Sequence, residues 1–232
     1  MNVLQSGKTT FKIEVPFRLY EQGEPGPKPL LIYLQDYDQD IQRLESQMIP
    51  LLDLKGYHLF IQAPYADHRV LPTDQSRGYG WYLDHGHRGS LEKSLEYASE
   101  FIQGVIDARL PYINVTRCVV IGVEMGATQA GYFGFTRWKH TNELILIGGR
   151  FYQEWFEQRD WTKRKSLQVL ACIRTPTSED DFIKEVAINK ARERGLNINI
   201  EKFNTMAPSL ESSLKSAHRW LISLGYVNSN VN

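Results

Sequence analysis

The stretch Cys-Val-Val-Ile-Gly-Val-Glu-Met-Gly-Ala, residues 118–127, decides the fold. Residues 118–121 form a continuous apolar run, which is typical of a strand covered on both faces. Gly122 and Gly126 then bracket Glu124, and small residues follow. Glycines allow a tight turn and close packing of the next helix. The stretch therefore predicts a buried strand, a sharp turn centred on Glu124, and a helix.

The same alternation of strand and helix continues on both sides of this stretch. Further buried strands are predicted at residues 30–34, 57–63, 144–147, 167–173 and 197–203, and a half-buried edge strand at 11–20. Helical spacing and end signals predict helices that run from Ile41 to a stop at Gly56, from an N-cap at Ser90, from Ser178 to Gly195, and from Ser209 to Leu224. This order predicts an α/β fold with a mostly parallel central sheet and helices on both faces. We expect one domain over residues 1–232, with a core at about 11–224 and a polar tail at 225–232.

Composition excludes several classes of protein. Hydrophobic residues make up 42% and charged residues 23%, as in globular proteins and unlike disordered chains. Lysine plus arginine and aspartate plus glutamate both number 27, so the net charge is zero and no nucleic-acid partner is predicted. No apolar run is long enough for a membrane span, and no signal peptide is recognisable. The two cysteines, Cys118 and Cys172, lie in apolar runs and predict buried free thiols, which favours a cytoplasmic location.

The pattern Gly122-x-Glu124-x-Gly126 has the frame of a nucleophile elbow. In that motif a sharp turn between a strand and a helix presents the central side chain above the sheet. Open α/β sheets bind ligands at the carboxyl ends of their strands, which is where this turn is predicted to lie. The alternative interpretation is a simple tight turn with a solvent-facing glutamate.

From about residue 11 to residue 224 the chain resembles the carboxylesterase/phospholipase branch of the α/β hydrolases, which includes the acyl-protein thioesterases. The landmarks are the strand 29–34, the Gly-Trp-Tyr-Leu-Asp segment at 80–84, the elbow at 122–126, the strand and Gly-Gly at 144–149, and the loops after 172 and 200. The resemblance implies an α/β-hydrolase fold. It also implies a site in which nucleophile, acid and histidine follow in that order along the chain.

The residues at the implied catalytic positions depart from that family. Glu124 stands at the nucleophile position, Asp180 at the acid position, and Pro208 at the histidine position. Gln35 and Asp36 replace the His-Gly pair of the oxyanion loop, where an aspartate would repel the developing charge. Ester hydrolysis by a serine triad needs a hydroxyl, an imidazole and amide donors. The sequence therefore predicts an esterase-like pseudoenzyme that binds a small ester-like ligand or a peptide in its cleft.

The alternative is an active hydrolase of carboxylic esters or thioesters that uses Glu124 with His85 or His87 as base, or that uses an atypical catalytic set. These histidines also form a weak Asp-His-x-His pattern, but we predict no metal and no cofactor. If Glu124 is not a nucleophile, we expect the Met125 amide and the Gln35 side chain to hold its carboxylate inside the oxyanion hole. Trp81 is expected to reach the cleft, and a homodimer is compatible with the sequence.

Overall fold

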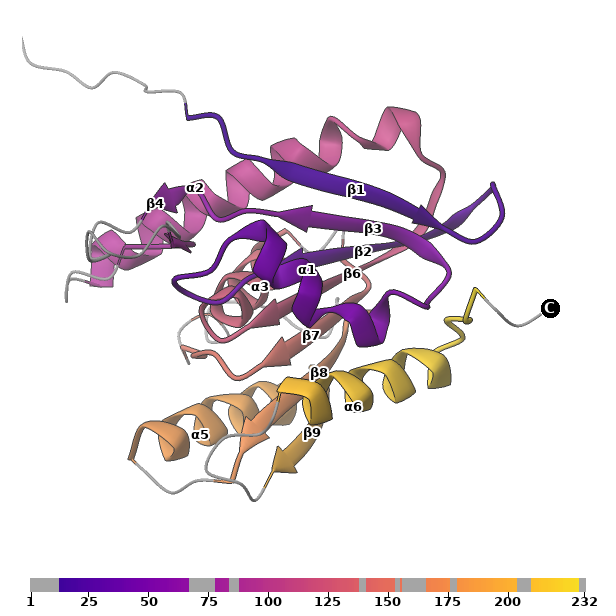
Figure 1. The fold of residues 1–232 in the computed structure, drawn as a ribbon. Helices are drawn as coiled ribbons and strands as arrows, with labels where there is room; N and C mark the ends of the chain where they lie inside the picture. The colour runs from indigo at the N-terminus through magenta and orange to yellow at the C-terminus, as the bar shows by residue number, and fades with distance from the viewer. Residues whose placement is uncertain are drawn as a thin grey trace, which may run out of the picture.

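The computed structural model describes residues 13–66, 78–83, 88–137, 141–152, 155, 166–175, 179–203 and 210–229 (Figure 1). Over these residues, seven strands form one sheet in the order β1-β3-β2-β6-β7-β8-β9. The strands are β1 Phe17–Gln22, β2 Lys28–Leu34, β3 Gly56–Ile61, β6 Val115–Val123, β7 Glu143–Ile147, β8 Gln168–Arg174 and β9 Asn197–Phe203. Two short strands, β4 Tyr65–Ala66 and β5 Tyr79–Gly80, pair separately.

Strand direction and register bring the carboxyl ends of the central strands together. Only β1 runs antiparallel, at the edge beside β3, and the other pairs in the sheet of the described residues are parallel. Gly122 of β6 is paired with Leu34 of β2 on one side and with Leu146 of β7 on the other. The loops that follow these three strands therefore start side by side at one edge of the sheet.

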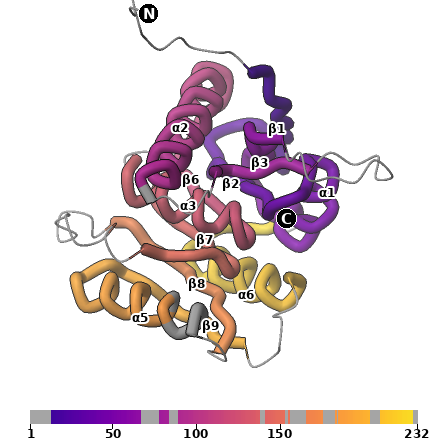
Figure 2. The backbone as a smooth tube through the Cα atoms, turned by 90° about the vertical axis from the view of Figure 1, so that its left-hand side faces the viewer, coloured from indigo at the N-terminus to yellow at the C-terminus, as the bar shows by residue number. Residues whose placement is uncertain are grey.

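Helices cover both faces of the sheet. The α-helices are α1 Ile41–Gln47, α2 Arg88–Asp107, α3 Met125–Thr136, α5 Glu179–Glu193 and α6 Leu210–Ser223, with short 3-10 turns η1 Ile49–Leu51 and η2 Leu110–Tyr112. Figure 2 shows α2 and α5 on one side of the sheet and α1 and α6 on the other. This arrangement confirms the predicted α/β fold class with a mostly parallel sheet and helices on both faces.

Alternation along the strands builds two apolar cores. In β2, Ile32 and Leu34 face a core shared with α2, α3 and α5, whereas Leu31 and Tyr33 face a core shared with α1 and α6. All four side chains are fully buried. A strand with both faces covered is a near-continuous apolar run, which is why residues 30–34 of β2 show no polar alternation. No helix among the described residues combines the length and apolar character needed to cross a bilayer.

Two helix boundaries differ from the sequence predictions. Gly56 begins β3 and does not end a helix, because α1 already stops at Gln47 and a 3-10 turn containing Pro50 follows. Proline has no N–H to donate, so the α-helical pattern cannot continue through it. Ser90 lies inside α2, which begins at Arg88, and is not its N-cap. The predicted caps Ser178 and Ser209 lie outside the described residues.

Residues 225–229, the described part of the predicted polar tail, pack against the rest of the domain. Tyr226 is buried, and its hydroxyl donates to Glu143 Oε2 at 2.8 Å. The backbone of residues 227–229 exchanges hydrogen bonds of 2.7 Å with Asp53 and Lys55. These contacts extend beyond the core boundary predicted at about residue 224.

Candidate functional site

The turn after β6 has a strained backbone centred on Glu124. This residue has φ 46° and ψ −105°, a combination that a non-glycine residue rarely adopts. Such a conformation costs about 1–3 kcal/mol and persists only when the surroundings enforce it. The Glu124 N–H donates to the Ile147 carbonyl of β7 at 2.7 Å, and the Glu124 side chain is exposed. The predicted sharp turn is therefore present, with its central side chain presented at the carboxyl edge.

Two glycines of the turn are required by close backbone contacts. A Cβ on Gly122 would lie 2.2 Å from the Gly126 carbonyl oxygen. A Cβ on Gly126 would lie 2.3 Å from the Leu34 carbonyl oxygen and 2.4 Å from that of Gln35. The N-terminus of α3 is thus pressed against the end of β2 and the loop that follows it.

The Asp36 side chain lies where the loop after β2 meets the N-terminus of α3, and it accepts hydrogen bonds from backbone amides of both. Its Oδ1 accepts the N–H of Met125, the first residue of α3, at 3.1 Å. The same oxygen accepts the N–H of Tyr37 at 2.6 Å. Burial raises the pKa of Asp36, and the Met125 N–H and the Arg43 charge offset only part of that rise. The α/β-hydrolase oxyanion hole consists of the amide after the nucleophile and an amide of the loop after the equivalent of β2. An Asp36 oxygen fills that place here.

Glu124 takes a different partner from the one predicted. We expected the Met125 amide to hold the Glu124 carboxylate, but Met125 donates to Asp36. Glu124 Oε2 instead accepts the N–H of Gly149 at 3.3 Å, in the loop after β7. A Cβ on Gly148 would lie 2.3 Å from Glu124 Oε1, so the missing side chain of Gly148 leaves the room that the glutamate needs.

Gln35 and Trp81 support the loop and do not face an open cleft. The Gln35 side-chain amide donates to the Gln39 carbonyl, so the predicted donation to Glu124 is wrong. Trp81 is fully buried, and its indole N–H donates to the Gln35 carbonyl at 2.9 Å. The Trp81 backbone N–H lies 3.3 Å from the Met125 sulfur. Trp81 therefore braces the loop from the core side, which corrects the expectation that it reaches the cleft.

The predicted acid and base positions fall largely outside the described residues. Asp180 lies in the first turn of α5, and its side chain is not described. Pro208, His85 and His87 lie outside the described residues, so their roles stay predictions.

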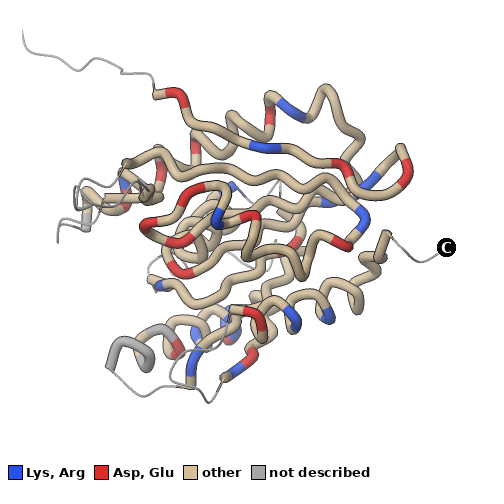
Figure 3. Tube along the Cα trace, in the orientation of Figure 1, with Lys and Arg blue, Asp and Glu red and all other residues tan. Residues whose placement is uncertain are grey.

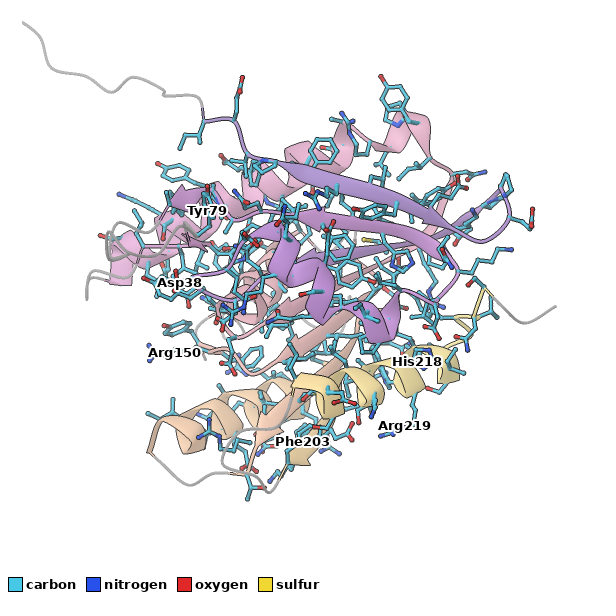
Figure 4. The ribbon with its side chains drawn as sticks, in the orientation of Figure 1. Asp38, Tyr79, Arg150, Phe203, His218 and Arg219 are labelled. Carbon is cyan, nitrogen blue, oxygen red and sulfur yellow. The ribbon has the colours of Figure 1, made fainter. Side chains whose placement is uncertain are left out.

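The described histidines, His58 and His218, are engaged away from the elbow. His58 is buried between the Tyr33 hydroxyl at 2.8 Å and the Leu54 carbonyl at 2.9 Å. His218 lies on α6, 3.2 Å from Asp53. Figure 4 shows His218 on that helix, whereas Asp38, Tyr79 and Arg150 mark the carboxyl edge. Neither histidine is therefore positioned to serve Glu124 as a base.

The loop that joins β2 to α1 makes the site acidic. It contains Asp36, Asp38 and Asp40, and the last of these caps α1 by accepting the Arg43 N–H at 2.8 Å. Figure 3 shows acidic positions along the chain leading into α1. Over the described part of the chain, no group of three or more His, Cys, Asp or Glu side chains is arranged to hold a metal ion.

A cavity of about 210 Å³ lies at the opposite edge of the sheet. It is lined by the amino-end residues of β6, the end of α2 and Asn142, and it includes Leu30 and Cys118. The cavity shares no residue with the elbow.

The two cysteines are buried free thiols, as predicted, and burial raises the pKa of Cys172 to about 12 and that of Cys118 further. Neither thiol is therefore available as a nucleophile at neutral pH.

Comparisons with known proteins establish the fold. No family model and no curated protein sequence matches this chain. Among solved structures, a carboxylesterase from Mesorhizobium loti matches 90% of this chain and 94% of its own with a TM-score of 0.68 and 12% identity. Acyl-protein thioesterase 2 from Zea mays matches 90% and 98% with a TM-score of 0.65 and 12% identity. Esterase PE8 matches 91% and 99% with a TM-score of 0.65 and 17% identity. The chain therefore has the α/β-hydrolase fold of carboxylesterases and acyl-protein thioesterases.

Proposed function

We propose that this protein is an esterase-like α/β-hydrolase homologue that binds a small ester-like ligand or a peptide at the carboxyl edge and does not hydrolyse it. The observation that carries the proposal is the identity of the elbow residue. Glu124 holds the backbone conformation that presents a nucleophile in this fold, but its side chain is a carboxylate with no hydroxyl. The chain thus keeps the fold, but a carboxylate stands where serine hydrolases have the hydroxyl that attacks the ester.

The oxyanion corner supports the same proposal. Acyl transfer needs amide donors that are open to the oxygen on which negative charge develops. Here the Met125 and Tyr37 amides already bond Asp36 Oδ1. A substrate carbonyl would have to displace a carboxylate and would remain beside its charge, which opposes oxyanion formation. The absence of a hydroxyl at the elbow and the occupied amide pair both support a protein that does not hydrolyse esters by the serine route.

Ester turnover tests the catalytic half of the proposal. Purified wild type and Glu124→Gln are compared on p-nitrophenyl acetate and p-nitrophenyl butyrate, and wild type is also incubated with a fluorophosphonate. We expect the same background rate from both proteins and no labelling. Turnover at least about tenfold faster in wild type than in Glu124→Gln would assign an active hydrolase that uses Glu124, with His85 or His87 as its candidate base.

Binding is tested with an ester that such a protein would leave intact. Methyl butyrate is titrated into ¹⁵N-labelled full-length protein, and the amides of Glu124, Gly148 and Gly149 are followed. Saturable shifts at these amides, with the ester recovered unchanged, are expected. Shifts confined to other parts of the protein would contradict binding at this edge. Homodimer formation and a cytoplasmic location stay predictions from the sequence.

A further inference from the structure

Two backbone amides from distant parts of the chain converge on one oxygen of Asp36. Tyr37 belongs to the loop after β2, and Met125 is the first residue of the 12-residue helix α3. Their N–H groups donate to Asp36 Oδ1 at 2.6 Å and 3.1 Å. Converging amides at a helix N-terminus stabilise negative charge through their own dipoles and through the helix dipole. The observed carboxylate therefore lies in an anion-binding arrangement made of backbone atoms.

The positions of these amides are fixed by contacts that do not involve the Asp36 side chain. On the α3 side, Gly126 packs against the Leu34 and Gln35 carbonyls. On the loop side, the Trp81 indole donates to the Gln35 carbonyl, and the Gln35 amide donates to Gln39. Removing the Asp36 side chain should therefore leave both donors near their present positions.

We propose that Asp36 is an internal ligand of an otherwise complete anion site and that it determines which class of ligand the cleft admits. While Asp36 fills the amide pair, an incoming carboxylate or oxyanion finds no free donors there and meets negative charge. Neutral ligands are not repelled by the Asp36 charge. The inference rests on the proposed function only in placing the ligand at the same edge, and it adds the exclusion of anions.

The substitution Asp36→Gly supplies a direct test. It deletes a CH₂–COO⁻ group, which has the shape of acetate, so acetate is the matched probe. Asp36→Asn is the control because it removes the charge but keeps an acceptor oxygen of the same geometry. Acetamide, the neutral analogue of acetate, is the control ligand.

Acetate is titrated into ¹⁵N-labelled full-length wild type, Asp36→Gly and Asp36→Asn, at constant ionic strength. In Asp36→Gly we expect saturable shifts of the Met125 and Tyr37 amides, with weaker binding of acetamide. Half-saturation in wild type and Asp36→Asn should need at least about tenfold more acetate, because the side-chain oxygen at position 36 already occupies both amide donors. Equal responses in all three proteins, or no response in a folded Asp36→Gly, would overturn the proposal.

A second measurement keeps the proposal testable if Asp36→Gly does not fold. In wild type, the Met125 and Tyr37 amide shifts should titrate together with one midpoint above the ordinary range of aspartate. The other charged groups of the corner are Asp38 and Asp40 on the loop, Arg43 on α1 and Glu124 on the elbow. All of these are kept in Asp36→Asn, so a titration that persists in that variant would overturn the assignment to Asp36. Ester turnover, which tests the proposed function, is read separately.

Discussion

Asp36, which follows β2, and Glu143, which begins β7, are two sheltered carboxylates at opposite edges of the same sheet, and they are held in different ways. Asp36 at the carboxyl edge accepts only backbone N–H groups in its described contacts, from Tyr37 and Met125. Glu143 begins β7 at the amino edge, is 1% exposed, and pairs with the Arg117 guanidinium and the Tyr226 hydroxyl. A buried charge needs such partners in either case.

The difference separates a structural ion pair from a potential binding site. The partners of Glu143 are side chains, so its loss leaves the Tyr226 hydroxyl without this acceptor and the Arg117 guanidinium with the Leu224 carbonyl. The partners of Asp36 are backbone groups placed by glycine contacts, so its loss leaves two aligned donors. We therefore expect the carboxyl edge to be sensitive to backbone changes and the amino edge to side-chain changes.

The largest expected effect is that of Gly126→Ala. The new Cβ would lie 2.3–2.4 Å from two backbone carbonyl oxygens, and neither can move without disturbing β2. We expect a loss of about 4 kcal/mol in the free energy of unfolding, measured by urea denaturation. Gly104→Ala on α2 is the control, because a Cβ there would meet nothing within 4 Å outside the backbone of its own helix. This variant should raise the free energy of unfolding by about 1 kcal/mol. Equal stability of the two variants would contradict the close contact.

The next effect is that of Glu143→Gln at the amino edge. It removes the charge that pairs with Arg117, whose side chain is 28% exposed, and should cost about 2 kcal/mol of unfolding free energy, since the charge-assisted bonds to the buried carboxylate weaken. Glu211→Gln, which breaks the exposed pair with Lys215, should leave the urea midpoint unchanged. A cost for Glu143→Gln no greater than that of Glu211→Gln would remove the proposed contrast between the two edges.

Tyr226→Phe is expected to have a smaller effect at the same edge. It deletes the hydroxyl that donates to Glu143 Oε2 at 2.8 Å but keeps the buried ring. A charge-assisted hydrogen bond of this kind is worth about 1.5–3 kcal/mol, and we expect a loss near the lower figure. Hydrogen exchange should also speed up at the Lys55 amide, which bonds Val227. Unchanged exchange there would show that the C-terminal segment docks without Tyr226.

The smallest effect concerns the pH dependence of stability at Asp36. Burial raises the pKa of this carboxyl in the folded protein, so the folded state binds its proton more readily than the unfolded state. The stability of wild type relative to Asp36→Asn should therefore increase as pH falls through the raised pKa. This increase should be complete below the ordinary aspartate pKa. Urea midpoints measured across this acid range test the sign, and a relative loss toward acid would contradict it.

The sequence predicted most of the fold because burial leaves a strong pattern in this chain. The apolar runs 30–34 and 118–121 indicated strands covered on both faces, and the glycines around Glu124 indicated the turn. Helix ends were less accurate. Glycine commonly follows the end of a helix, which is why Gly56 was predicted as a stop. The helix ends earlier, before the 3-10 turn that contains Pro50. Tyr226 was missed because a single aromatic in a polar segment gives no periodicity.

The site was predicted in its parts but not in its pairing. Glu124, Met125 and Asp36 were all identified, yet which carboxylate accepts the Met125 N–H depends on backbone and side-chain geometry that the residue types do not encode. Tyr37 and Gly149 contribute through their backbone N–H groups, and a sequence carries no residue-type signal for a backbone donor. The one usable signal was the position of Asp36 directly after the strand and glutamine that border the elbow.

The most direct test of the central claim is a through-hydrogen-bond NMR experiment that correlates backbone amide nitrogens with the Asp36 carboxylate carbon. We predict correlations from both Met125 and Tyr37 to Asp36 Cγ in the wild-type protein. The Ala127 amide, which bonds the Glu124 carbonyl at 3.0 Å, serves as the internal reference. Correlations to Asp36 that are absent while the Ala127 reference is visible, or a correlation from Met125 to the Glu124 carboxylate, would contradict the account.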